Sequence, residues 1–520
     1  MKPTSARISQ LAFLALFLIL FVQTEYRGHD EINAAVNAFF RADPLVLFSY
    51  LLAAKTWTWL LLPALLMVVA TLLLGRFFCG WICPLGTVLD LVTPKKRTRR
   101  PIAALKGNLK YWLLLPILAA ALFNLNLAGL LDPMAILLRG VTFFLYPLLG
   151  LGAREGWVGL YRLLGERRDA VAPAYELLHT YLLPFRETLY PLAAFSALAL
   201  LAIIALEQFE ERNWCRNLCP LGTLLGWLGR FSLFKRIPAG LCSDCGKCRE
   251  LCPTTFDRDL LAKEECILCM ECQLHCPHQR ISFRLTPGRT GAGPLLPERR
   301  VLLGSMATGL LLAIPARFRP PEKGLRLLRP PGVRNEDEFR NKCVRCGECM
   351  KVCLKNALYP AAWQAGMEGI YTPVVVPRLG YCEYNCTLCG QVCPTGAIPK
   401  LPASIKQREV IGKAVLDKNH CLPFAKRIDC MVCEEHCPIP SKAIRTREVE
   451  VLGLDGVRKK VKEPYVVEEI CNGCGICENV CPLETKAGIE VFAVTNRTPI
   501  AESPGDAADT TGSGSGLGYQ

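Results

Sequence analysis

The sequence is poor in charge and in histidine, and it lacks the short motifs that bind nucleotides or c-type haem. Charged residues make up 21% of its 520 residues, and only six residues are histidine. The absence of Cys-x-x-Cys-His excludes covalently attached c-type haem, and the histidines do not pair across apolar runs as b-type haem requires. No Rossmann or P-loop fingerprint stands out. We therefore expect no nicotinamide, flavin or nucleotide site.

Isolated cysteines are also missing, because all 28 cysteines fall into closely spaced groups. A disulfide scaffold is typical of short secreted chains, and this chain is long and rich in apolar runs. Repeated short spacing indicates chelation instead. The net charge is +15, and the densest basic run lies beside apolar stretches, which indicates control of membrane topology and not nucleic-acid binding.

Hydrophobic residues make up 51% of the chain, and five apolar runs are candidate membrane spans. A helix needs about 20 apolar residues to cross a bilayer, with a range from about 17, so the first and last runs are short. A sixth stretch, residues 134–151, contains Arg139, Pro147 and several glycines, and is more typical of a re-entrant or interfacial piece. The five runs are Ile8–Val22, Trp57–Leu74, Tyr111–Leu131, Leu189–Leu206 and Val301–Ala316.

Basic residues in the short loops predict the orientation. Residues 94–110 hold seven Lys or Arg and no acid, which predicts a cytoplasmic loop, whereas residues 23–56 hold three bases and four acids and should be outside. Residues 132–188 should also be outside. They nevertheless carry Arg154, Arg162, Arg167 and Arg168. Residues 237–285 then lie in the cytoplasm, and the chain from about Arg317 lies outside.

The fifth apolar run follows the sequence Pro297-Glu-Arg-Arg-Val-Leu-Leu303. This resembles a twin-arginine export signal, here internal. The alternative is an ordinary span with basic flanks on its inner end. Both interpretations send the remaining chain outside, and we expect the segment to be kept as a span.

Twenty-four cysteines form six quartets. Three quartets match C-x2-C-x2-C-x3-C-P, a fourth has leucine in place of the proline, and two are stretched between their first and second cysteines. The regular quartets are Cys242, Cys245, Cys248, Cys252; Cys266, Cys269, Cys272, Cys276; Cys471, Cys474, Cys477, Cys481; and, with Leu354, Cys343, Cys346, Cys349, Cys353. The stretched quartets are Cys382, Cys386, Cys389, Cys393 and Cys421, Cys430, Cys433, Cys437.

This spacing is typical of [4Fe–4S] clusters, because three thiolates on one tight loop reach three irons and the fourth cysteine usually ligates the other cluster of a pair. Small residues at Gly246, Gly347, Gly473 and Gly475 allow backbone amides to approach the sulfides. Sharing would place Cys276 with the first triplet and Cys252 with the second. For the last four quartets we expect a nested pairing, outer with outer and inner with inner.

Two alternatives remain for the quartets. Zinc sites typically use two Cys pairs separated by a longer gap, which is not this pattern. Disulfides are the second alternative, because an external domain lies where they form. Export of the domain already folded and loaded with clusters would remove this objection to iron–sulfur clusters outside the cytoplasm.

Two further motifs lie at the predicted cytoplasmic ends of spans, Cys79-x3-Cys83-Pro-Leu-Gly-Thr and Cys215-x3-Cys219-Pro-Leu-Gly-Thr. The spacing places both sulfurs on one helical face, and the repeat indicates an internal duplication. Packing of buried cysteines or a structural dithiol is the alternative. We expect all four to converge on one redox centre, either a seventh cluster or a dithiol pair.

We expect electrons to enter from membrane quinol, since the sequence has no recognisable motif for a nucleotide cofactor. Candidate proton acceptors are His29 and His179, just beyond outer span ends, and Asp132 near the end of the third run. A plain interfacial polar role is the alternative for each.

Two resemblances follow from these motifs. Residues 1–285 resemble the NapH-type membrane ferredoxins, because they contain four spans, two Cys-x3-Cys-Pro motifs and a paired-cluster segment. The Cys-x3-Cys-Pro motif is also found in NosR and CcoG. Residues from about 295 to 492, with the twin-arginine leader and four quartets, resemble NapG or MauM-type polyferredoxins. The chain thus resembles a fusion of the two. The resemblance implies a quinol dehydrogenase component of the periplasmic nitrate reductase type, and the departures are the fusion itself and Leu354.

We therefore expect a multi-domain protein of the bacterial inner membrane: an α-helical membrane bundle of four to five spans plus two α+β ferredoxin-like modules. It would pass electrons from the quinone pool through six [4Fe–4S] clusters to a periplasmic reductase or cytochrome. The alternative is a redox maturation factor for a metalloenzyme. The expected segments are 1–236 (membrane), 237–285 (two clusters), 295–318 (span), 319–335 (linker), 336–492 (four clusters, periplasmic) and 493–520 (disordered).

Overall fold

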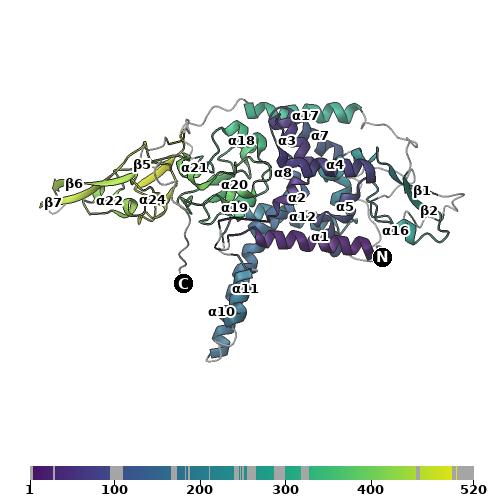
Figure 1. Cartoon of the computed structure of the whole chain (residues 1–520), viewed down its shortest axis with the longest axis horizontal. Coiled ribbons are helices and arrows are strands. Elements are labelled where there is room, and N and C mark those ends of the chain that lie inside the picture. Colours follow the sequence, from purple (N-terminus) through teal and green to yellow (C-terminus); the bar gives the residue numbers. More distant parts are fainter. Residues whose placement is uncertain are drawn as a thin grey trace, which may run out of the picture. The chain divides into compact units, whose positions relative to one another are not determined.

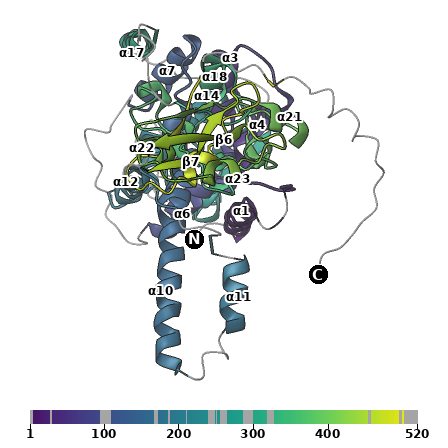
Figure 2. The ribbon, with the colours of Figure 1, turned by 90° about the vertical axis from the view of Figure 1, so that its left-hand side faces the viewer.

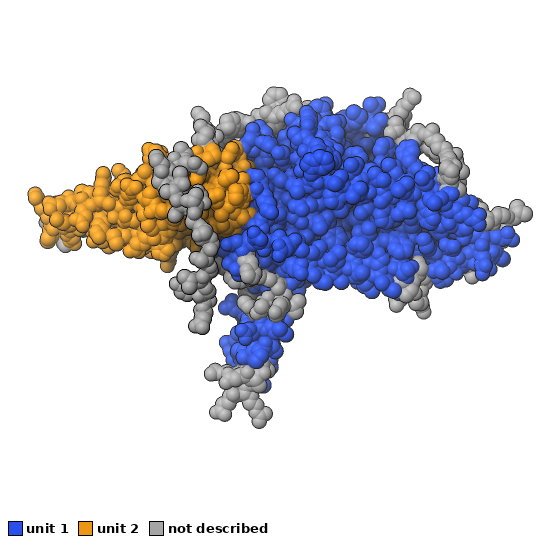
Figure 3. All heavy atoms as spheres, in the orientation of Figure 1, with its two compact units in different colours: residues 1–323, 335–374, 388–400 blue, residues 324–334, 375–387, 401–520 orange. Residues whose placement is uncertain are grey.

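The computed structural model divides the chain into two compact units, coloured in Figure 3. The first comprises residues 1–323, 335–374 and 388–400, and the second comprises residues 324–334, 375–387 and 401–520. The segment predicted as one domain, 336–492, is therefore divided, with its first part in the unit of the N-terminal helices. The residues described are 4–26, 28, 30–93, 109–165, 172–181, 183–184, 188–209, 211–238, 245, 248, 251–254, 265–285, 299–317, 327–452, 457–494 and 499–500.

The first unit is a bundle of apolar helices (Figure 1). Four of its helices begin on a proline that follows an Asp or Cys N-cap, because proline at the first helical position loses no hydrogen bond. The helices are α1 (Thr4–Gln23), α2 (Asn37–Arg41), α3 (Pro44–Ala54), α4 (Leu62–Leu74) after the 3₁₀ turn Trp59–Leu61, α5 (Phe77–Trp81), α6 (Pro84–Val92), α7 (Leu109–Leu122), α8 (Ala128–Leu131), α9 (Pro133–Gly140), α10 (Tyr146–Leu164), α11 (Ala172–Tyr181), α12 (Ala193–Leu206), α13 (Asn213–Asn217), α14 (Pro220–Gly229) and α17 (Arg299–Arg317).

Helix α17, which contains the twin-arginine-like segment, packs along α7. Two glycines of α17 permit the close approach: a Cβ at Gly304 would lie 2.4 Å from the Trp112 ring, and one at Gly309 would lie 2.6 Å from Ala119 Cβ. Small residues at helix contacts are typical of helices that associate in a bilayer.

Two helical runs are long and apolar enough to cross a membrane, Ser5–Gln23 and Pro133–Leu164. Five other apolar helices among the described residues have between 10 and 17 residues, so a bundle of four to five full-length spans is not confirmed. They are Pro44–Ala54, Trp59–Leu74, Leu109–Leu122, Ala193–Leu206 and Leu302–Leu311.

Residues 134–151, predicted to form a re-entrant or interfacial piece, lie in one continuous helical run made of α9, a π-helical turn (Val141–Leu145) and α10. This run excludes a re-entrant turn, and an interfacial position stays a prediction. Pro147 does not interrupt the run, since it lies in the first turn of α10. Arg139 is accommodated inside the unit: its guanidinium donates to the carbonyls of Arg345 and Leu130 at 3.1 Å and lies 4.3 Å from the Tyr371 ring centre.

Helices α10 and α11 lie side by side and extend away from the bundle (Figures 1 and 2). The rings of Trp157 and Tyr175 join them, with centroids 5.2 Å apart. Figure 1 shows that this pair runs across the direction of α1 and α17.

Small cysteine-bearing elements complete the first unit. Near its Cys266 quartet, β1 (Phe234–Pro238) pairs antiparallel with β2 (Ile281–Leu285), beside the short helix α16 (Glu271–Leu274). The Cys343 quartet lies among α18 (Glu336–Lys342), α19 (Glu348–Lys351), β3 (Leu358–Pro360), the 3₁₀ turn Met367–Gly369, β4 (Pro373–Val375) and α20 (Leu388–Val392).

The second unit has the architecture of a small two-cluster ferredoxin. Its first and last strands, β5 (Lys413–Leu416) and β8 (Ile489–Phe492), pair antiparallel. Strands β6 (Ile444–Leu452) and β7 (Arg458–Val466) form a longer ribbon in which Ile444 faces Val466. Short helices α21 (Ala403–Arg408), α22 (Leu422–Ala425), α23 (Val432–Glu435) and α24 (Ile476–Asn479) carry or flank the cysteines.

Candidate metal centres

Three cavities are each lined by four cysteines. The cavity of about 360 Å³ in the first unit takes three cysteines from the fourth regular quartet and one from the next quartet, whereas the cavities of about 370 and 310 Å³ both lie in the second unit. Their cysteines are Cys343, Cys346, Cys349 and Cys393; Cys421, Cys430, Cys433 and Cys481; and Cys471, Cys474, Cys477 and Cys437.

Each cavity therefore takes three cysteines from one quartet and its fourth cysteine from the neighbouring quartet in the sequence. The nested pairing that we expected is wrong: the Cys421 and Cys471 quartets pair with each other, and Cys393 joins the Cys343 triplet. Adjacent quartets pair because the strands that flank them, β5 and β8, close one small fold around both sites.

The N-terminal pair follows the same rule where it is described. Cys252 lies close enough to Cys266, Cys269 and Cys272 to act electrostatically on all three thiols, as the sharing pattern predicts. Cys242 and Gly246 lie outside the described residues, so the other site of this pair stays a prediction.

The cluster loops share a backbone conformation. In three quartets the residues two and four positions after the first cysteine are left-handed: Leu268 and Met270, Arg345 and Gly347, Gly473 and Gly475. Alternating left-handed residues turn successive amide N–H groups toward a common concavity, which suits an anionic group. The predicted role of the glycines thus has a geometric basis at Gly347, Gly473 and Gly475.

An orphaned cation supports the fit of an iron–sulfur cluster in the 360 Å³ cavity. Arg345 lines this cavity and is 1% exposed. Its Nη2 donates to the Glu368 carbonyl at 2.7 Å, but Nε and Nη1 have no hydrogen-bond partner among the described residues. Buried donors without partners are costly, and the sulfur atoms of a cluster are suitable acceptors.

Burial raises the pKa of cavity thiols. Burial, followed by the charges of neighbouring cysteines, raises the pKa of Cys433 to about 12. Burial also raises the pKa of Cys474 to about 12, against a lowering by the Ile476 amide. Such thiols are neutral at pH 7 unless a metal lies among them, since metal binding and deprotonation are coupled.

A zinc ion and a cubane place different demands on four thiols. Four thiolates at the Zn–S distance of about 2.3 Å lie about 3.8 Å from one another. Within the described part of the chain, no three His, Cys, Asp or Glu side chains converge on a single ion. A cubane instead has one cysteine at each of four separated irons, which fits four thiols around a cavity.

The four cysteines of the repeated membrane motifs converge on one buried site. Cys79, Cys83, Cys215 and Cys219 belong to one core, and their charges act on one another. In each motif the amide three residues after the second cysteine donates to its sulfur, Gly86 to Cys83 at 3.4 Å and Gly222 to Cys219 at 3.3 Å.

Two buried arginines cross between the motifs with approximate two-fold symmetry. Arg76 donates to the Cys215 carbonyl at 2.6 Å and from Nε to Cys79 Sγ at 3.4 Å, and Arg212 donates to the Cys79 carbonyl at 2.6 Å. Their charges are balanced by acids: Arg212 pairs with Asp90 at 2.5 Å, and Arg76 pairs with Glu265 at 3.0 Å.

Comparison with known proteins decides the family. The ferredoxin-type protein NapG of Escherichia coli K12 is 37% identical over 161 residues, which are 31% of this chain and 68% of NapG. The methylamine utilization ferredoxin-type protein MauM of Methylorubrum extorquens is 36% identical over 202 residues, 37% of this chain and 88% of MauM. The chain belongs to the NapG/MauM family of ferredoxin-type proteins.

Family models cover both halves of this NapG/MauM relative. A 4Fe-4S dicluster domain matches residues 342–397, which contain the Cys343 and Cys382 quartets, and residues 426–485, which contain the Cys471 quartet and all of the Cys421 quartet except Cys421 itself. A 4Fe-4S binding domain matches twice, at 56–101 and 191–238, once around each Cys-x3-Cys-Pro motif. The putative electron transport protein YccM of Escherichia coli K12 is 29% identical over 219 residues, 40% of this chain and 51% of YccM. No solved structure matches.

Of the three predicted proton acceptors, the structure describes the side chain of Asp132. Asp132 is fully buried, caps α9 through the Ala135 amide at 2.8 Å, and lies beside the carboxyl of Asp43, which caps α3. This placement agrees with a structural polar role. His29 lies outside the described residues, and His179 lies on α11 without a described side chain.

Sequence reasoning missed the two arginines of the four-thiol site. A signal was available, because Arg76 and Arg212 each precede the first cysteine of their motif by three residues. It also missed Glu265, which directly precedes the quartet cysteine Cys266 and pairs with Arg76 and Lys110.

Proposed function

We propose that this iron–sulfur electron-transfer protein is a membrane wire that takes electrons from quinol and delivers them to a periplasmic reductase or cytochrome. It would combine a NapH-like membrane part with the NapG/MauM-type part in one chain. Each quinol would give two electrons and two protons and become quinone, and the electrons would move singly between clusters.

The carrying observation is a continuous buried core in the first unit. This core includes Cys269, all four cysteines of the membrane motifs, and Cys346. At one end a Cβ on Gly80 would lie 2.1 Å from the Ile267 carbonyl, and at the other a Cβ on Gly129 would lie 1.7 Å from that of Val344. Cluster loops thus abut both ends of the bundle (Figure 1).

Six [4Fe–4S] clusters would use the 24 quartet cysteines. Cys353 would ligate a different cluster from Cys343, since Cys393 takes the fourth place in the cavity of the Cys343 triplet. The four membrane-motif thiols would hold a seventh centre, with Arg76 and Arg212 stabilising its negative charge.

Retention of α17 as a membrane anchor also belongs to this proposal. Its glycine contacts with α7 support a helix that stays with the bundle, and the residues after it would lie in the periplasm.

Metal analysis and quinol reduction test the proposal together. Anaerobically purified full-length protein should contain about 24 irons per chain, or about 28 with a seventh cluster, and equal acid-labile sulfide. A quinol analogue should bleach its absorption near ~400 nm. Zinc in place of iron, or clusters inert to quinol and quinone, would overturn it.

A further inference from the structure

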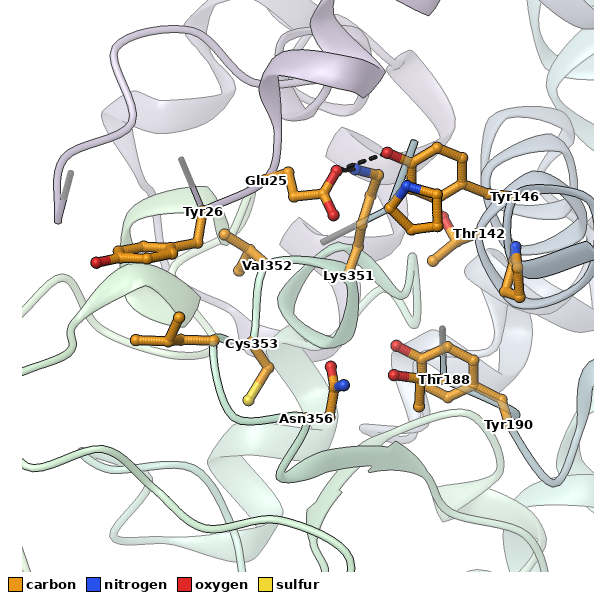
Figure 4. Close-up of a pocket in the computed structure, with 13 residues that line it drawn as sticks. Glu25, Tyr26, Thr142, Tyr146, Thr188, Tyr190, Lys351, Val352, Cys353 and Asn356 are labelled. Carbon is orange, nitrogen blue, oxygen red and sulfur yellow. Dashed lines mark hydrogen bonds and ion pairs between the residues drawn. The ribbon is translucent and has the colours of Figure 1, made fainter. Parts of the chain in front are cut away.

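A cavity of about 450 Å³ lies in the first unit, apart from the cysteine-lined cavities (Figure 4). Its walls come from the end of α1, the start of α10, the segment before α12 and the loop after α19. The lining includes Glu25, Thr142, Tyr146, Thr188, Tyr190 and Cys353.

Two of the lining hydroxyls lack partners. Thr142 and Thr188 are 3% and 7% exposed, and neither Oγ1 has a hydrogen-bond partner among the described residues. Buried hydroxyls are nearly always bonded, and a serine or threonine in a helix usually donates to a carbonyl one turn back, as Ser196 of α12 does to Leu192. The pair therefore indicates a polar ligand.

A charged group faces the same space. Tyr146 donates its hydroxyl to Glu25 Oε2 at 2.6 Å, and Lys351 Nζ lies 3.7 Å from that oxygen. Lys351 also donates to the Thr24 carbonyl at 2.9 Å and lies 4.9 Å from the Tyr146 ring centre. Figure 4 shows this group above Cys353 and Asn356.

The cavity also touches a cluster ligand at the point where the quartet departs from its usual pattern. Cys353 lines the cavity, and so does Leu354, which replaces the proline found after the fourth cysteine of the other quartets. Leu354 contributes apolar surface to the cavity wall next to Cys353.

Apolar surface leads away from the cavity. Next to the lining residue Pro147, Leu148 and Leu149 of α10 are 51% and 55% exposed. An amphiphile could therefore place a polar ring in the cavity and a hydrocarbon tail along exposed helix surface.

We propose that this cavity binds the hydroquinone head group of a quinol, an assignment that rests on the proposed function. Tyr146 and Tyr190 contact the ring, and the threonine hydroxyls and Glu25 bond its oxygens. Oxidation to quinone would release two electrons one at a time: the cluster that Cys353 helps to hold would take the first, pass it to another cluster of the chain and then take the second. One proton passes to the Glu25 carboxylate and the other to water at the cavity mouth.

Kinetics of quinol oxidation by full-length protein in detergent test this site. Thr188→Val and Glu25→Gln should each raise the quinol concentration for half-maximal reduction by about tenfold, with iron content and dithionite bleaching unchanged. The matched control is Thr308→Val, because the Thr308 hydroxyl bonds the Gly304 carbonyl inside α17, away from the cavity. It should behave as the parent protein.

A photoreactive azidoquinone gives a second measurement on the unmodified protein, so that a variant that fails to fold leaves the site testable. Labelled peptides should contain Glu25–Tyr26 or Thr188–Tyr190. If quinol reduces the parent protein but the variants need the same quinol concentration, or the label maps elsewhere, the proposed binding site is wrong and the proposed electron-transfer function is unaffected. If quinol never reduces the parent although dithionite does, the proposed function itself fails.

Discussion

At the scale of single residues, the cluster loops depend on backbone that only some residues tolerate. Gly473 has φ 72°, and a Cβ there would lie 2.3 Å from the Gly412 carbonyl oxygen. Because the atoms nearest to this Cβ belong to the Gly412 backbone, which cannot move aside as a flexible side chain does, a side chain at position 473 would force the cluster loop open.

We therefore expect Gly473→Ala to remove one cluster, lowering iron by about four per chain. Gly152→Ala is the control, since Gly152 lies in α10 with nothing within 4 Å of an added Cβ. Iron and sulfide analysis measures both. Unchanged iron in Gly473→Ala would contradict the tight loop.

Ligand exchange makes a prediction about pairs of residues. Cys343 and Cys393 line one cavity, whereas Cys353 does not line it. Serine at both Cys343 and Cys393 should therefore remove one cluster, about four irons, because the two losses fall on the same site. Serine at both Cys343 and Cys353 should remove two, about eight irons. The reverse order would show that each quartet keeps its own cluster.

At the scale of elements, four helices of the bundle begin with the same kind of N-cap followed by proline. Asp43-Pro44 and Asp132-Pro133 begin α3 and α9, just as Cys83-Pro84 and Cys219-Pro220 begin α6 and α14. In every case the cap side chain accepts from a backbone amide of the first turn. The duplication seen in the sequence thus extends to buried caps.

Asp43→Ala should remove a cap and destabilise the protein by about 1 kcal/mol. Asp43→Asn keeps an acceptor oxygen and removes one of two neighbouring carboxyls, so it should be at least as stable as the parent. Thermal unfolding in detergent compares the two. Equal melting temperatures for Asp43→Ala and the parent would show that the cap contributes little.

At the scale of the whole molecule, the proposed function and the charge pattern predict that the two ends of the first unit's core lie on opposite sides of a membrane. Residues 237–285 should be cytoplasmic and residues after 317 periplasmic. Alkaline phosphatase needs disulfides, which form outside the cytoplasm. Fusion after Phe492 should therefore give activity, and fusion after Leu285 should give none. Activity at Leu285 would reverse the topology.

The direction of the helix pair α10 and α11 affects how the orientation of the chain is interpreted. The pair extends across the direction of α1 (Figures 1 and 2), so α10, which carries Arg154 and Arg162, would not run parallel to the spans if α1 crosses the bilayer. Counting basic residues predicted the orientation least well for residues 132–188. Such a count uses only loop length and charge, and it contains no information about the direction in which a helix leaves the bundle.

The sequence by itself determined the chemistry that depends on short spacing: the quartets, the paired Cys-x3-Cys motifs and the family follow from residues a few positions apart. Tertiary structure decided what depends on distance through space. Cys393 joins Cys343 across 50 residues of chain, Arg76 reaches the carbonyl of Cys215, and Glu25 meets Lys351 beside Cys353. No local pattern encodes such contacts, because they arise only when separate elements pack around one core.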